Sequence, residues 1–229
     1  MSFVDKIQTA LEGLMKKSPD FDPSVFQSSL AQQTSWEPLK PGGTNVDTHE
    51  LKEIHSGQFQ FVLKKKAKLF PFFFVVPGLL FGGVFPLGLL IENGWNPGVL
   101  ITFLLGAMLG GVGFGILYKW STPIVLDFDR GVFYRGRAGL RNLKGNQDHC
   151  LLKEVGGLQI LAEHITSSSG NSTHHSFRSY ELNFVLNDGS RHNLVDHGKL
   201  ETIQENAHEL SCLLKIPVWD KTNPPSSSN

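Results

Sequence analysis

The chain has 229 residues, of which 21 are basic and 21 are acidic, so its formal net charge at pH 7 is zero. A balanced charge gives no electrostatic reason to bind nucleic acid, and we expect no nucleic-acid partner. The two cysteines, Cys150 and Cys212, fall in segments that the charge distribution assigns to the cytoplasm. Thiols stay reduced there, so we expect no disulfide.

The first 48 residues are predicted to form one helix and a linker. In residues 1–17, Phe3, Ile7 and Leu14 fall on one face of an amphipathic helix. This helix either lies in the membrane interface or docks on the soluble domain or a partner, and the helical pattern favours neither. Residues 18–48 are rich in Ser, Gln, Pro and Gly without a sustained period, which is typical of a linker.

Residues 49–68 are predicted to contain a juxtamembrane strand. The stretch 59–63 (Phe-Gln-Phe-Val-Leu) has strand-forming residues with partial alternation. A lone strand is not stable, so its natural partners are strands that follow the apolar part of the chain. The sequence leaves open whether this segment completes the later sheet.

Two long uncharged stretches come next, residues 69–91 and 99–119, with a short polar link at 92–98. A helix of ~20 apolar residues crosses the ~30 Å hydrocarbon core of a bilayer, so the sequence predicts a transmembrane hairpin. The alternative is a pair of buried helices in a soluble core. A chain of this length has one modest core, which could hardly bury two helices that are apolar all round.

Basic residues flank this hairpin and are missing from its link. The positive-inside rule therefore places both termini in the cytoplasm and the link in the periplasm. The flanking charges serve either topology alone or attraction to anionic lipid headgroups. They are Lys64, Lys65, Lys66, Lys68, Lys119, Arg135, Arg137 and Arg141. Aromatic side chains mark the expected boundaries, with Trp95 at the outer one and Tyr118 and Trp120 at the inner one.

Glycines recur at a spacing of four residues inside the hairpin. Glycines four residues apart leave bare backbone on a helix face and allow close packing of the two spans, or contact with another chain. These glycines are Gly78, Gly82, Gly106, Gly110, Gly111 and Gly115. Pro71, Pro77 and Pro86 predict an irregular or kinked first helix. Neither span carries an ionisable side chain in its interior, which argues against a proton relay, an ion path or a pump.

Residues 120–220 are predicted to form a small antiparallel β domain. The turn Asp129-Arg130-Gly131 joins strands at 124–128 and 132–135. A further strand is expected at 158–165, followed by an exposed loop at 166–176 that is dense in Ser, Thr, Asn and His.

The clearest β-hairpin joins residues 180–186 to 190–195 through Asp188-Gly189. A helix at 198–215 then carries its apolar residues on one face, which must pack on the sheet. Residues 221–229 have the composition of a disordered tail.

This arrangement resembles uncharacterised bacterial two-span inner-membrane proteins with a cytoplasmic pleckstrin-homology-like (PH-like) β domain. Short blocks that are similar to such proteins are Ser179-Tyr180-Glu181-Leu182-Asn183, Asp188-Gly189-Ser190-Arg191, Val195-Asp196-His197-Gly198 and Val218-Trp219-Asp220. The resemblance covers about residues 35–220 and implies the bacterial inner membrane as the location. It implies no assigned activity. The expected fold class is therefore an α+β membrane protein: a two-helix hairpin plus a PH-like β domain closed by a C-terminal amphipathic helix.

The sequence contains candidate groups for chemistry but no diagnostic spacing. His208 and Cys212 lie one helical turn apart on the water-facing side of the last helix, yet no Cys-x-x-Cys or His-Glu-x-x-His motif occurs, and we expect no metal or other cofactor. Ser190, Asp196 and His197 are the residue types of a hydrolase triad, but a nucleophile elbow is missing. Asp196 is expected to cap the last helix instead.

Two hypotheses of different classes follow. In the first, the chain is a non-enzymatic membrane-anchored binding or scaffold module, whose β domain meets a protein segment or lipid headgroups at the inner leaflet. In the second, it is an accessory subunit of a larger membrane complex, or a homo-oligomer, that packs through its glycine faces. An enzyme ranks third.

Overall fold

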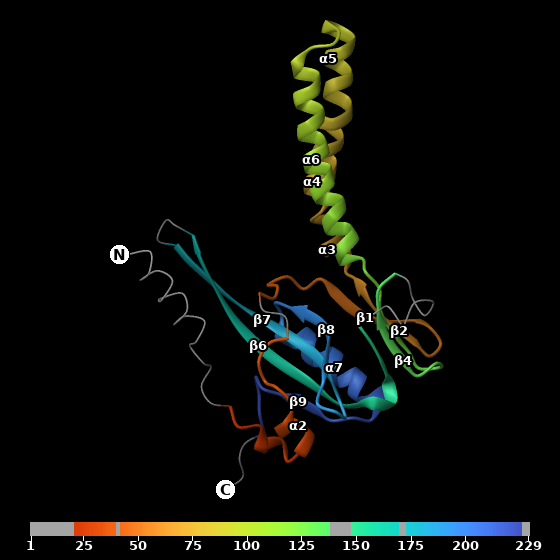
Figure 1. Cartoon of the computed structure of the whole chain (residues 1–229), viewed down its shortest axis with the longest axis vertical. Helices are drawn as coiled ribbons and strands as arrows, with labels where there is room; N and C mark the ends of the chain where they lie inside the picture. Colours follow the sequence, from red (N-terminus) through yellow and green to blue (C-terminus); the bar gives the residue numbers. More distant parts are fainter. Residues whose placement is uncertain (1–20, 40–41, 138–147, 170–172, 226–229) are drawn as a thin grey trace.

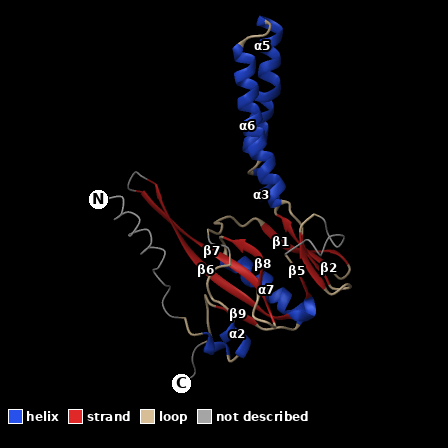
Figure 2. Cartoon of the chain, viewed as in Figure 1, coloured by secondary structure: helices blue, strands red, loops and turns tan. Residues whose placement is uncertain are grey.

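The computed structural model describes residues 21–39, 42–137, 148–169 and 173–225. Two long apolar helices project as a rod from a body that contains two β-sheets (Figure 1). The rod is helical apart from short turns, whereas all the described strands lie in the body (Figure 2). The class is therefore α+β. The predicted N-terminal helix at 1–17 lies outside the described residues.

The rod, residues Lys65–Trp120, is called the apolar hairpin below. Its first arm covers Lys65–Asn93 and its second arm is α6 (Pro97–Trp120). Each arm is long and apolar enough to cross a membrane, and only 17% of its most apolar part is buried. This low burial disagrees with the alternative of two soluble core helices, because a core helix would be mostly covered by protein.

The first arm is irregular, as its prolines predict. It consists of α3 (Lys65–Leu69), α4 (Phe72–Leu79), a π-helical turn η2 (Leu80–Val84) and α5 (Phe85–Asn93). Pro71 lies at the break between α3 and α4, and Pro77 lies inside α4 just before the π-helical turn. Proline has no amide hydrogen and clashes with the preceding turn, so the regular ladder cannot continue through it.

The second arm is a single α-helix of 24 residues because it has no proline beyond its first position, and its start is well capped. The Asn96 side chain accepts a hydrogen bond from the amide of Gly98 at 2.9 Å, and Pro97 occupies the first helical position, where an amide hydrogen is not needed. Only residues 94–96 of the predicted link 92–98 are non-helical.

The five-stranded sheet contains the point where the hairpin is inserted. Its order is β1-β2-β3-β4-β5, with antiparallel neighbours throughout. β2 pairs with β3 from Gln58↔Asp127 to Gln60↔Val125, although the whole apolar hairpin separates them in sequence. The segment before the hairpin thus completes the sheet after it. The strands are β1 (His49–His55), β2 (Gln58–Leu63), β3 (Ile124–Asp127), β4 (Val132–Arg135) and β5 (His149–Leu151).

The four-stranded sheet has the order β8-β7-β6-β9, and β9 pairs with β6 in parallel while the other neighbours are antiparallel. A short 3₁₀ turn, η4 (Leu152–Glu154), leads into it. The helix α7 (Leu200–Leu214) follows β8. The strands are β6 (Val155–Ser169), β7 (Thr173–Leu186), β8 (Arg191–His197) and β9 (Val218–Asp220).

Both sheets and α7 share one apolar core. Phe133 of β4 meets Phe184 of β7 with ring centroids 5.5 Å apart and planes at 86°, and both side chains are fully buried. Ile203 and Leu210 bring the apolar face of α7 into this same core. The predicted role of the last helix is therefore confirmed.

The part of residues 18–48 that the structure describes is not a free linker, which corrects the sequence prediction. It contains η1 (Pro23–Phe26) and α2 (Ser29–Gln33). Ala31 of α2 is fully buried beside Val185 and Trp219, so this segment packs on the second sheet. Its two helices are short and bury few side chains, so they leave no periodic pattern in the sequence.

Two other predictions about elements need correction. Residues 49–68 hold two strands, and their last part, Lys65–Leu69, is helical. Most of the expected loop 166–176 belongs to strands, because β6 and β7 pair out to Ser169↔Thr173. A continuous partner strand satisfies the main chain there, which outweighs the polar composition. The sequence also missed β9, which uses only three residues.

Candidate functional site

The base of the hairpin is tied to the β domain through side chains that bond to its main chain. His49 Nε2 lies 2.9 Å from the carbonyl oxygen of Trp120. A carbonyl only accepts, so Nε2 carries the hydrogen and Nδ1 accepts from the Thr48 hydroxyl at 2.7 Å. Burial lowers the pKa of His49, which keeps the ring neutral. The last turn of α6 is therefore held in a defined position over β1.

Arg137 also contacts the end of α6. Its Nη2 donates to the carbonyl oxygen of Tyr118 at 2.6 Å and to Oγ of Ser121 at 2.8 Å. The guanidinium carbon also lies 4.1 Å from the centroid of the Tyr118 ring, a cation–π contact. Arg137 thus joins the segment after β4 to the hairpin. It also places a positive charge at the base of the hairpin.

The entry to the first arm is held by a partly buried polar cluster. Lys64 Nζ lies 2.5 Å from an Asp47 carboxylate oxygen, which also accepts from the Thr202 hydroxyl at 3.4 Å. The other Asp47 oxygen lies 3.5 Å from Nδ1 of His197, whose side chain is completely buried. Burial lowers the pKa of His197 to about 4, so this ring is neutral near pH 7. The cluster connects the segment before β1, the hairpin, β8 and α7.

The predicted basic residues have different roles in the structure. Lys65, Lys66, Lys68 and Lys119 are exposed around the base of the hairpin, as expected for a membrane border. Lys64 and Arg137 make the contacts described above. Arg141 lies outside the described residues.

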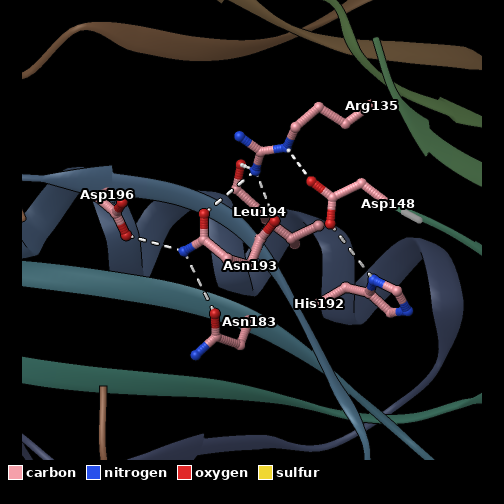
Figure 3. Close-up of polar contacts among 7 residues, drawn as sticks. All are labelled: Arg135, Asp148, Asn183, His192, Asn193, Leu194 and Asp196. Atoms are coloured by element: carbon pink, nitrogen blue, oxygen red, sulfur yellow. Dashed lines mark hydrogen bonds and ion pairs between the residues drawn. The ribbon is translucent and has the colours of Figure 1, made fainter. Parts of the chain in front are cut away.

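Arg135, predicted at the membrane border, joins the two sheets (Figure 3). From β4, its Nη2 donates to the carbonyl oxygens of Asn193 at 2.6 Å and Leu194 at 3.0 Å. Its Nε lies 3.4 Å from one oxygen of Asp148, whose other oxygen lies 3.8 Å from Nδ1 of His192. Burial lowers the pKa of Arg135, and Asp148 acts in the opposite direction. The positive charge of Arg135 is thus bound by Asp148 and by main-chain carbonyl oxygens of β8.

Asp196 does not cap the last helix, which corrects another prediction. Its Oδ1 accepts from Asn193 Nδ2 at 2.9 Å, and the same amide nitrogen lies 3.4 Å from Oδ1 of Asn183 (Figure 3). The N-cap of α7 is Lys199, whose side chain makes no capping bond. Asp196 therefore belongs to a polar network on the strands β7 and β8.

The aromatic anchors lie at the two ends of the hairpin. Trp95 is 74% exposed at the tip, and Tyr118 is 67% exposed at the base. Trp120 stacks on Phe70, with ring centroids 5.8 Å apart, and so connects the bases of the two arms. Their roles at the membrane boundaries stay a prediction.

Four of the predicted glycines lie where the two arms touch. A Cβ on Gly78 would approach the amide nitrogen of Gly110 to 2.5 Å, and a Cβ on Gly106 would overlap the main chain of Gly82. Main chain meets main chain here, so no side chain fits between the arms. Gly111 and Gly115 face away from this contact, and a methyl group at either position would meet no atom within 4 Å. The six glycines thus form an inner and an outer set.

The candidate catalytic groups are not brought together. Ser190 bonds to Asp188 at 2.6 Å at the start of β8, whereas His197 is buried beside Asp47 at the other end of that strand. His208 Nε2 and Cys212 Sγ are 3.8 Å apart and exposed, as predicted. Burial raises the pKa of the Cys150 thiol to about 12. Within the described residues, three or more His, Cys, Asp or Glu side chains do not gather in a metal-binding arrangement.

Sequence reasoning missed a strap across the outer face of the second sheet, formed by residues 35–39 and 42–43. The Leu39 amide donates to both carboxylate oxygens of Glu181 at 3.0 Å, and Gln159 Nε2 donates to the Ser35 carbonyl at 2.9 Å. Glu163 and Arg191 hold further main-chain groups of the strap. The structure shows that Gln159 and Glu181 are buried, whereas the sequence offered only their polar character on predicted strands as a signal.

No protein-family profile, curated protein or solved structure matches the chain. The class rests on the fold and the site alone: an α+β protein with an apolar helical hairpin inserted between neighbouring strands of a two-sheet domain, and with basic side chains around the point of insertion. The resemblance to bacterial PH-like membrane proteins stays a prediction.

Proposed function

We propose that the chain is an integral protein of the bacterial inner membrane, whose hairpin anchors a non-enzymatic β domain at the cytoplasmic face as a binding or scaffold module. The observation that carries this proposal is the outward-facing apolar surface of the hairpin. Phe73 is 76% and Ile91 75% exposed, and many other large apolar side chains of both arms are exposed too. Each Å² of such surface costs ~25 cal/mol in water, and lipid removes this cost.

The charges support an orientation with both termini in the cytoplasm. Lys65, Lys66, Lys68 and Lys119 surround the base of the hairpin, whereas Trp95 and the uncharged residues 93–98 lie at its tip. Positive side chains are retained on the cytoplasmic side, and tryptophan prefers the interface. The β domain then lies against the inner leaflet, because β2 and β3 lead directly into the two arms.

A PH-like module is compatible with this body. It has mostly antiparallel strands in two sheets, with a helix near the C-terminus whose apolar face enters the core. In this proposal, the domain binds a protein segment or lipid headgroups and catalyses no reaction.

Carbonate extraction and cysteine labelling test the anchor and its orientation. The full-length protein should stay in the membrane at alkaline pH. An impermeant maleimide should label Asn93→Cys from outside intact spheroplasts, and should label the exposed Cys212 only after permeabilisation. Release by carbonate, or labelling of Cys212 from outside, would refute the proposed arrangement.

The second candidate is an accessory subunit that packs through the hairpin. It is favoured by a notch of about 320 Å³ in the hairpin surface, whose lining includes Gly83, Phe103, Gly111 and Phe114. Purification in mild detergent should then yield a stoichiometric partner or a homo-oligomer. Gly111→Ile should abolish this association, whereas Gly88→Ile, at an exposed glycine outside the notch, should not. A lone monomer for the unsubstituted protein would remove this candidate.

A further inference from the structure

A groove of about 380 Å³ opens at the base of the apolar hairpin, between β2 and the ends of both arms. It exists because β2 extends beyond its neighbour. Pairing of β2 with β3 stops at Gln60↔Val125, whereas β2 continues to Leu63. From there the chain enters α3, and it returns from α6 at Trp120 before it reaches β3. The two paths diverge and leave the groove between them.

The lining of this groove is apolar toward the hairpin and polar at its edge. Phe72 and Leu117 come from the two arms, and Val62 comes from β2. Lys68 and the hydroxyl-bearing Ser121 and Thr122 supply the polar part. Phe72 is 47% exposed, so its ring is available to a ligand. The groove therefore suits a molecule with an apolar chain next to a polar head.

The charge around the groove is positive. Lys68 is exposed, and within the described part of the chain its ammonium group forms no ion pair. The exposed Lys65, Lys66 and Lys119 lie on the same two helix ends. Of these four lysines only Lys68 lines the groove. A cation beside an apolar wall that forms no ion pair with the described residues favours an anionic head, and one basic residue in contact with that head strengthens binding about fivefold.

We propose that this groove holds one anionic phospholipid, with an acyl chain against Phe72 and Leu117 and the phosphate at Lys68. The inference rests on the proposed membrane anchor, because the groove lies at the end of the two arms where headgroups would be. A free phosphate would leave the apolar wall in water. The lipid instead fills the gap between β2 and the hairpin, and so joins the β domain to the inner leaflet at a fixed distance.

The test uses the full-length protein in nanodiscs of mixed phosphatidylglycerol and phosphatidylcholine, released into mild detergent for native mass spectrometry. The protein should retain one phosphatidylglycerol in preference to phosphatidylcholine. Lys68→Gln should lower this occupancy about fivefold. Lys65→Gln removes the same charge from the same helix but lies outside the groove, and it should leave the occupancy unchanged.

A second variant tests the apolar wall. Leu117→Trp fills the groove and should reduce retention of both lipids, while circular dichroism shows that the protein is still folded. Equal occupancy in Lys68→Gln and Lys65→Gln would overturn the proposal, since it assigns the effect to general surface charge. Absence of retained lipid from the unsubstituted protein would overturn it too, although the anchor would stand if carbonate fails to extract the protein. Extraction by carbonate would overturn both.

Discussion

The apolar hairpin and the β domain hold together by opposite means. In the β domain, large side chains such as Phe133, Phe184 and Leu210 are fully buried between the sheets and α7. In the hairpin, large side chains point outward, and the contact between the arms is made by main chain at Gly78, Gly106 and neighbouring glycines. One region is stabilised by burial of apolar area, the other by close approach of two backbones.

This difference follows from the surroundings that each region requires. Water drives apolar side chains together in the β domain. Lipid gives no such drive, because its chains are as apolar as leucine, so close packing must hold the arms together. The outer face of the hairpin should therefore tolerate a loss of side-chain size, whereas the core of the β domain should not.

The largest effect is expected from Phe184→Ala in the β domain. It removes a fully buried ring that contacts Phe133, and such a change costs about 3–5 kcal/mol of unfolding free energy. Denaturant unfolding of the full-length protein in detergent measures it. Phe73→Ala, at the 76% exposed position of the hairpin, should change stability by less than about 1 kcal/mol. A similar cost for both variants would contradict the comparison.

The next effect is expected from Gly106→Leu in the hairpin. Its Cβ would overlap the main chain of Gly82 and Phe81, so the arms must separate, at a cost of about 3 kcal/mol. Gly115→Leu adds the same side chain where there is open space, and it should have little effect on the hairpin. Cysteine cross-linking between the arms, followed during titration with denaturing detergent, reports their separation. Equal behaviour of the two variants would show that backbone contact does not hold the arms.

Much of this architecture could be predicted from the sequence because its signals are local. Uncharged length predicted two long apolar helices, Pro71 and Pro77 predicted the irregular first arm, and the Asp188-Gly189 turn predicted the hairpin of β7 and β8. The glycine spacing also predicted that small residues pack the arms, although it did not separate the inner set from the outer set.

Two of the missed features depend on partners that are distant in sequence. The strap looks like a linker because its main chain is held by Glu181 and Gln159, more than a hundred residues away. Arg135 looks like a border charge until β4 is placed beside β8. Sequence periodicity reports which side chains are apolar, but it does not report which buried polar side chain serves which distant group.

Acid should weaken the β domain and leave the hairpin unaffected, because charged side chains of the arms lie only at their ends. His197 has its pKa lowered to about 4 by burial, and Asp47, His49 and Lys64 are the charged or titratable groups around it. As the pH falls through 6.5, His197 takes up a proton in the unfolded chain but not in the folded one. The stability that the neutral buried ring allows is therefore complete above pH 6.5 and is lost as the pH falls from there toward about 4. Between pH 7 and 5 the loss is about 2 kcal/mol.

The pH dependence of unfolding, followed by tryptophan fluorescence, checks this expectation. His197→Gln cannot be protonated and should show a smaller loss over the same range. The His49 ring, whose pKa burial also lowers, should account for part of the remaining slope. An equal slope in both proteins would mean that His197 is already charged in the folded state.

The smallest effect should come from the strap, which is held neither by buried apolar side chains nor by contact between two backbones. Glu181→Ala removes the carboxylate that accepts from the Leu39 amide, at a cost of about 1 kcal/mol. The change should let the strap detach locally while the core stays folded. Limited proteolysis near Leu39 should therefore become faster, while the melting temperature changes little. Glu209→Ala removes an exposed carboxylate from α7 and provides the control. If both variants are cleaved at the rate of the unsubstituted protein, the strap is held by the stacking of its Trp36 on Phe26 of η1, at 5.3 Å between ring centroids, and not by these polar bonds.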